Sequence, residues 1–147
     1  MRIAWSLFVC ALVAGCSGPE GPPINVSGLE IFAPLPGSNA GVAYFSVENN
    51  TDATIVVRRV DSPQFERVEL HESLLEDGVY RMNALDALTV DSRRAVTLRE
   101  GGKHLMLMSP RADLAVGQPV TLILHYDTDG EIVLRATLQS RVQLDED

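Results

Sequence analysis

The chain has 147 residues, of which 46% are hydrophobic, and its 12 Lys and Arg against 20 Asp and Glu give a formal net charge of −8. This length suits one domain with a substantial apolar core. The acidic balance argues against a nucleic-acid-binding protein, because such proteins need a basic surface to neutralise phosphates.

The N-terminal residues have the organisation of a bacterial signal peptide. A short positive start is followed by an apolar run over residues 3–13 that is too short to span a bilayer comfortably. The segment Leu12-Val13-Ala14-Gly15-Cys16 resembles the lipobox of bacterial lipoproteins, which implies cleavage before Cys16 and lipidation of that cysteine. We therefore predict a lipoprotein signal peptide over residues 1–15. The alternative is an ordinary signal peptide with an incidental cysteine.

A lipidated Cys16 would hold the mature protein on the periplasmic side of a bacterial membrane, since a multiply acylated residue is a stable anchor. By the same resemblance, Ser17 favours the outer membrane. Residues 16–23 are rich in Gly and Pro and are predicted to be a flexible spacer. One domain over residues 24–140 and an acidic tail over residues 141–147 complete the predicted organisation.

The cysteine content limits the chemistry of the mature domain. Cys10 lies in the predicted signal peptide and Cys16 would carry lipid, so no thiol or disulfide remains. Thiol exchange, thiolate zinc sites and cysteine nucleophiles are therefore excluded. Any soft metal ion would have to be held by methionine and histidine.

From residue 24 onward, short segments rich in Val, Ile, Leu, Thr and Tyr alternate with turn clusters. No window predicts a long amphipathic helix. The pattern is typical of an all-β sandwich or barrel with about eight or nine short strands. The predicted strands span residues 26–32, 41–48, 53–60, 65–71, 79–82, 95–99, 103–108, 120–127 and 131–138.

Four uncharged side chains stand out between residues 68 and 108, namely His71, Met82, His104 and Met106. Thioether sulfur is a poor ligand for hard cations and a good one for Cu(I), and imidazole suits copper as well. We therefore predict one Cu(I) site per domain, built from these four residues. An imidazole must be neutral to bind a metal ion, so copper affinity should weaken in acid.

Strand alternation predicts that these ligands lie on an outer face of the sandwich. Side chains two residues apart share a face, so His104 and Met106 point the same way while Leu105 points into the core. In the same manner, Glu69 and His71 share a face. A site there would be shallow, which suits a protein that hands its metal on.

The spacing of His71, ten residues, Met82, twenty-one residues, His104, one residue and Met106 resembles the signature of the periplasmic copper(I) chaperones of the PCu(A)C type. The resemblance covers residues 24–138. It implies a cupredoxin-like or immunoglobulin-like β-sandwich that binds one Cu(I) through two Met and two His. It also implies a non-enzymatic role, the delivery of copper to an acceptor protein of respiratory oxidase assembly alongside a thioredoxin-like copper protein.

Other polar residues have simpler interpretations. Met108 is expected to pack, and His125 is expected to be a solvent-facing strand residue. Glu69 or Glu72 could orient the imidazole of His71. The tail from Gln143 to Asp147 lacks Met and His, which argues against the second, Cu(II)-type site that some family members carry there.

Three other functions stay open at this point. The protein could be a copper storage or resistance lipoprotein, because storage and delivery need the same ligands. It could be a metal-free β-sandwich that binds protein partners. A copper redox enzyme is disfavoured, because such enzymes usually need a histidine-rich site and the chain has only three histidines.

Overall fold

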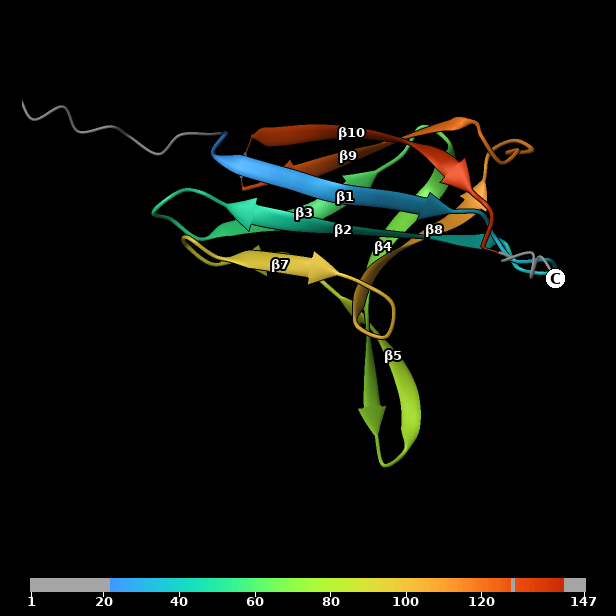
Figure 1. Cartoon of the computed structure of the whole chain (residues 1–147), viewed down its shortest axis with the longest axis horizontal. Coiled ribbons are helices and arrows are strands. Elements are labelled where there is room, and N and C mark those ends of the chain that lie inside the picture. Colours follow the sequence, from blue (N-terminus) through green and yellow to red (C-terminus); the bar gives the residue numbers. More distant parts are fainter. Residues whose placement is uncertain (1–21, 128, 142–147) are drawn as a thin grey trace, which may run out of the picture.

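The computed structural model describes residues 22–127 and 129–141, and all regular structure within them is β-strand (Figure 1). The predicted signal peptide, Cys16, most of the spacer and the tail beyond residue 141 lie outside the described residues. No helix in the described part is long and apolar enough to cross a membrane. The strands are β1 (Ile24–Phe32), β2 (Ala40–Asn49), β3 (Ile55–Asp61), β4 (Phe65–Glu76), β5 (Val79–Leu85), β6 (Leu88–Val90), β7 (Ala95–Leu98), β8 (Lys103–Pro110), β9 (Pro119–Tyr126) and β10 (Gly130–Gln139).

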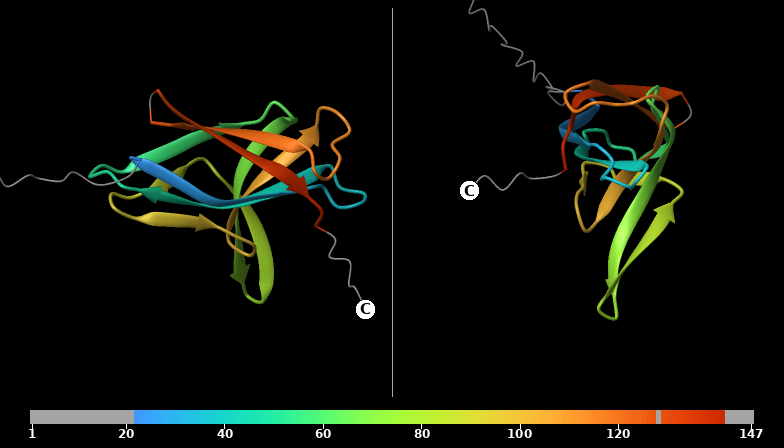
Figure 2. Two further views of the ribbon diagram at one scale, coloured as in Figure 1. Left: turned by 45° about the horizontal axis from the view of Figure 1, so that its top comes forward. Right: turned by 90° about the vertical axis from the view of Figure 1, so that its right-hand side faces the viewer.

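The strands form a two-layered sandwich (Figure 2). One layer has the order β5-β4-β8-β2-β1, with β7 also paired to β2, and the other has the order β10-β9-β3-β6. Among the described strands, neighbours run antiparallel except β1 and β10, which run parallel at Ile31↔Leu138 and Phe32↔Gln139 and thereby join the layers. The predicted all-β sandwich is confirmed.

The core lies between the layers and is built by strand alternation. On β9, Val120, Leu122 and Leu124 are fully buried, and on β8, Leu105 and Leu107 belong to the same apolar cluster. The residues between them on each strand therefore face outward. This places the even-numbered residues of β8 on the outer face of the first layer.

The β4–β5 hairpin differs from the prediction, which ended the fourth strand at His71 and the fifth at Met82. Both strands are longer and project beyond the sandwich (Figures 1 and 2). Asp77 and Gly78 form a two-residue turn with φ of 52° and 78°, the left-handed pair that tight hairpins favour. The strand ends were missed because this part of the hairpin has solvent on both faces, so no apolar alternation marks it. Large apolar side chains exposed there are Leu74, Leu75, Val79, Tyr80 and Met82.

The short strand β6 was also missed, and a buried amide secures its end. Asn49, at the end of β2, is 1% exposed. Its Nδ2 donates to the carbonyl oxygens of Ala53 (2.7 Å), Val90 (3.0 Å) and Asp91 (3.1 Å). Its Oδ1 accepts from the backbone N–H of Thr51 at 2.9 Å. One side chain thus holds the β2–β3 loop against the end of β6.

We expect Asn49→Ala to lower the free energy of unfolding by about 1–3 kcal/mol, because buried carbonyls lose their donor. Urea denaturation of the mature domain measures this change. The matched control is Asn50→Ala, since Nδ2 of Asn50 makes its hydrogen bond to the Pro22 oxygen at the surface, 3.1 Å away. That variant should change stability by less than about 0.5 kcal/mol. Equal losses in the two variants would contradict this account.

Candidate metal centre

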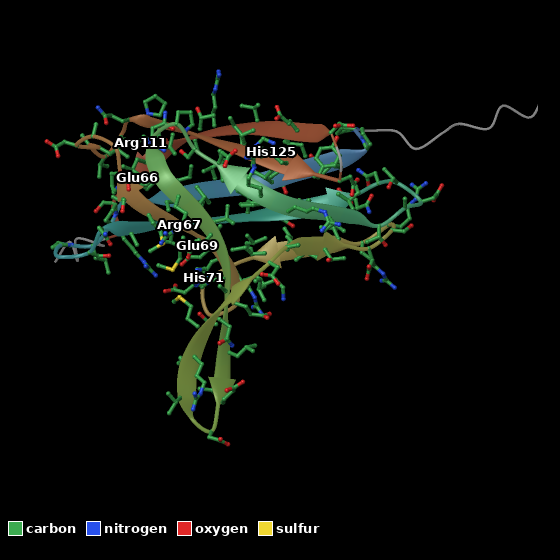
Figure 3. The ribbon with its side chains drawn as sticks, turned by 180° about the vertical axis from the view of Figure 1, so that it is seen from behind. Glu66, Arg67, Glu69, His71, Arg111 and His125 are labelled. Atoms are coloured by element: carbon green, nitrogen blue, oxygen red, sulfur yellow. The ribbon has the colours of Figure 1, made fainter. Side chains whose placement is uncertain are left out.

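The register of β4 against β8 brings the two predicted histidines together. His71 lies directly opposite His104, and Glu69 lies opposite Met106. Cross-strand partners share a face of the sheet, and the two imidazole centroids are 6.0 Å apart at an interplanar angle of 39°. Figure 3 shows Glu69 and His71 along β4, with sulfur atoms beside them.

Met82 reaches the same face from β5. It lies opposite Ser73, which follows His71 on the same face of β4. Met82, His104 and Met106 line one surface depression of about 430 Å³. The structure therefore brings all four predicted ligands onto one face across three adjacent strands. Other residues lining the depression include Ser73, Tyr44, Tyr80, Glu100 and Arg141.

The four side chains differ in their exposure to solvent. His104 is 6% exposed and the His71 side chain is 14% exposed, whereas Met82 is 53% exposed. The predicted shallow position therefore describes Met82 but not the imidazoles, which lie deeper than strand alternation alone suggests. A bound ion would have buried nitrogen donors on one side and an accessible sulfur on the other.

The hydrogen bonds of the imidazoles leave one nitrogen of each ring free. Nδ1 of His104 lies 2.9 Å from the Gly102 carbonyl oxygen, which can only accept, so Nδ1 carries the proton and Nε2 keeps its lone pair. Nε2 of His71 lies 2.9 Å from Oε2 of Glu69 and donates to it. Nδ1 of His71 is buried and has no hydrogen-bond partner within the described residues. A buried lone pair without a donor fits a position reserved for a metal ion.

A chain of contacts along β4 and β8 supports Glu69. Nε of Arg67 lies 2.6 Å from Oε1 of Glu69, and Nη2 of Arg67 lies 3.3 Å from the sulfur of Met108. The hydrogen bond from His71 is the main cause that lowers the pKa of Glu69 below its usual range; desolvation opposes it, and the charge of Arg67 lowers the pKa further. Met108 thus contacts a guanidinium.

Glu72 and His125 have partners away from the four ligands. Glu72 forms an ion pair with Lys103. His125 follows the buried Leu124 on β9 and so faces outward as predicted, but two carboxylates partly cover it. Its side chain is 21% exposed, with Nε2 2.9 Å from Asp61 and Nδ1 3.0 Å from Glu131. Sequence reasoning missed this cluster because its members come from three strands, β3, β9 and β10, with no common spacing.

Within residues 22–127 and 129–141, no three or more His, Cys, Asp or Glu side chains are arranged to hold a metal ion. The candidate centre is therefore defined by imidazole together with thioether. Of the residues that surround it, Glu69 carried a weak signal in the sequence, namely its place two residues before His71 on the same strand.

The chain is similar to lipoproteins and to solved copper proteins. It is 25% identical over 141 residues to "Putative lipoprotein Lxx21020" of Leifsonia xyli subsp. xyli, covering 88% of this chain and 84% of that protein. It is 24% identical over 114 residues to "Uncharacterized protein RP573" of Rickettsia prowazekii, covering 77% of this chain and 59% of that protein.

Among solved structures, the solution structure of CuI-DR1885 from Deinococcus radiodurans matches with a TM-score of 0.70 and 25% identity, over 86% of this chain and 85% of that one. The copper-bound PCuAC domain from PmoF2 matches with a TM-score of 0.67 and 24% identity, over 81% and 94%. The family model described as "Putative lipoprotein LpqE-like" matches residues 24–138. The resemblance predicted from the His and Met spacing is thus confirmed, and the chain belongs to the LpqE-like family of PCuAC domains.

Proposed function

We propose that this protein is an extracytoplasmic copper chaperone that holds one Cu(I) between His71, Met82, His104 and Met106. The observation that carries the proposal is the single face of the sheet that holds two imidazoles, each with a free ring nitrogen, and two thioethers. The copper-bound state of the similar PCuAC domain and of DR1885 supports the choice of metal.

The donor set favours Cu(I) over other ions. Both sulfur donors are neutral and soft, and both nitrogens are neutral imidazole lone pairs, which suits a monovalent soft ion better than a hard divalent one. His104 would bind through Nε2 and His71 through Nδ1, since the other nitrogen of each ring donates a hydrogen bond. Both histidines must be neutral to bind, so protons compete with copper.

The exposure of Met82 supports transfer by ligand exchange. An acceptor can approach the exposed thioether on the projecting hairpin before it meets the buried imidazoles of His71 and His104. An incoming soft donor would replace Met82 first, and the remaining ligands would follow one at a time. We propose that the acceptor belongs to respiratory oxidase assembly and that a thioredoxin-like copper protein takes part.

The proposed lipid anchor at Cys16 would keep the chaperone on the periplasmic side of a bacterial membrane. The lipoprotein names of the family and of the Leifsonia relative support this placement. Residues between Cys16 and Ile24 would then separate the lipid from the first strand of the sandwich.

We expect His104→Ala and Met106→Leu each to weaken Cu(I) binding by at least about tenfold, equal to ~1.4 kcal/mol, because each removes one donor. Leucine at position 106 keeps the apolar volume, so the loss reports on sulfur. Competition with a chromogenic Cu(I) chelator measures the affinity. His125→Gln on β9 is the matched control, because the partners of His125 are Asp61 and Glu131 and not the four ligands, and it should bind as the wild type does. Unchanged affinity in both ligand variants would remove the assignment.

Experiments in the native bacterium can distinguish copper delivery from copper storage. If the protein delivers copper, a deletion strain should lose oxidase activity at low copper and regain it at high copper, because excess metal bypasses a chaperone. The wild-type gene should restore activity at low copper, and a gene carrying His104→Ala with Met106→Leu should not. Normal oxidase activity at low copper, combined with sensitivity to high copper, would instead identify a storage or resistance protein.

A further inference from the structure

We infer that Glu69 is a positioning residue that holds the His71 ring with its proton on Nε2, so that His71 offers Nδ1 to the metal while His104 offers Nε2. This inference rests on the proposed copper site and deepens it. The two histidines would then bind through different ring nitrogens. Glu69, which is not itself a ligand, would determine which nitrogen His71 offers.

The first step of the argument is the contact between Glu69 and His71. The two residues are two apart on β4 and therefore share its outer face. Oε2 of Glu69 lies 2.9 Å from Nε2 of His71. An ionised carboxylate only accepts hydrogen bonds, so Nε2 must donate. In a neutral ring the proton then resides on Nε2, and Nδ1 keeps the lone pair.

The second step is the state of the other nitrogen. Nδ1 of His71 is buried without a hydrogen-bond partner in the described part of the chain. Buried polar atoms of this kind are rare and call for an explanation such as an ion. A half-turn of the ring about the Cβ–Cγ bond would put Cε1 in the place of Nε2 and would break the hydrogen bond to Glu69. The Glu69 contact therefore decides which nitrogen a metal can reach.

The third step is the rigidity of Glu69 itself. Its second oxygen, Oε1, lies 2.6 Å from Nε of Arg67, so the two carboxylate oxygens have different partners. The Arg67 side chain is 64% exposed, so this ion pair adds little stability by itself. Its effect is to fix the orientation of the carboxylate. Figure 3 shows Arg67, Glu69 and His71 following one another along β4.

His104 supplies an internal comparison, because its orientation depends on the backbone. Its Nδ1 donates to the Gly102 oxygen, which also accepts the N–H of Ser73 at 3.1 Å. The orientation of the His104 ring therefore depends on the backbone and, among the described residues, on no other side chain. A substitution of Glu69 should therefore alter His71 and leave His104 unchanged, whereas general loss of the fold would alter both.

The test uses uniformly ¹⁵N-labelled residues 17–147 and long-range ¹H–¹⁵N correlation spectra of the imidazoles, recorded without metal and with one equivalent of Cu(I). In the metal-free wild type we expect the proton on Nε2 of His71 and on Nδ1 of His104. Copper should shift the resonances of Nδ1 of His71 and Nε2 of His104. A chromogenic chelator provides the affinities.

The variants separate positioning from general structure. Glu69→Ala should abolish the slowly exchanging Nε2–H signal of His71 and weaken Cu(I) binding by about 10–100-fold, the usual effect of removing a residue that orients a ligand. Glu69→Gln retains an acceptor oxygen and should keep the signal and most of the affinity. Glu72→Ala removes a carboxylate from the other face of β4, where it pairs with Lys103, and should change neither.

Three results would overturn the inference: a proton on Nδ1 of His71 in the metal-free wild type, copper bound through Nε2 of His71, or an unaltered His71 spectrum in Glu69→Ala. Failure of the proposed function would give a different spectroscopic result. There, copper would shift no imidazole resonance in the wild type, while the metal-free spectra would still decide the proton positions.

Discussion

The register between β4 and β8 is the constraint on which the rest of the candidate centre depends. It sets His71 opposite His104 and Glu69 opposite Met106, with Leu70 opposite Leu105 on the core face. A slip by one residue would turn every side chain of one strand to the other face. The buried Leu105 and Leu107 oppose such a slip, because it would expose them and bury the polar set. The hydrophobic core therefore fixes the position of the candidate ligands from the opposite face of the sheet.

Because of this register, neighbouring residues on the same strand have different roles. On β8, Leu105 and Leu107 pack in the core, whereas His104 and Met106 face the candidate site. The imidazoles are held by hydrogen bonds that they donate to a carboxylate and to a carbonyl oxygen, whereas no hydrogen bond is described for Met82. The two imidazoles are thereby held in place, whereas Met82 lies exposed on the projecting hairpin.

Much of this arrangement could be predicted from the sequence, because period-two alternation is a local property. It correctly paired His104 with Met106 on one face and set Leu105 and Leu107 in the core. The length of the β4–β5 hairpin could not be predicted, since a hairpin with two solvated faces has no apolar pattern. The partners of His125 could not be predicted either. They depend on how β3, β9 and β10 are ordered in the sheet, which no local spacing encodes.

The exposed position of Met82 also makes the centre vulnerable. Oxidants that reach a membrane surface attack accessible thioethers first, and methionine sulfoxide offers a polar oxygen in place of the soft sulfur lone pairs. With Met82 53% exposed and Met106 half-buried, damage would fall on the hairpin before it reached the strand beneath. Sulfoxide reductases reverse this oxidation. Damage at Met82 could therefore be repaired, because its exposed side chain is accessible to such an enzyme.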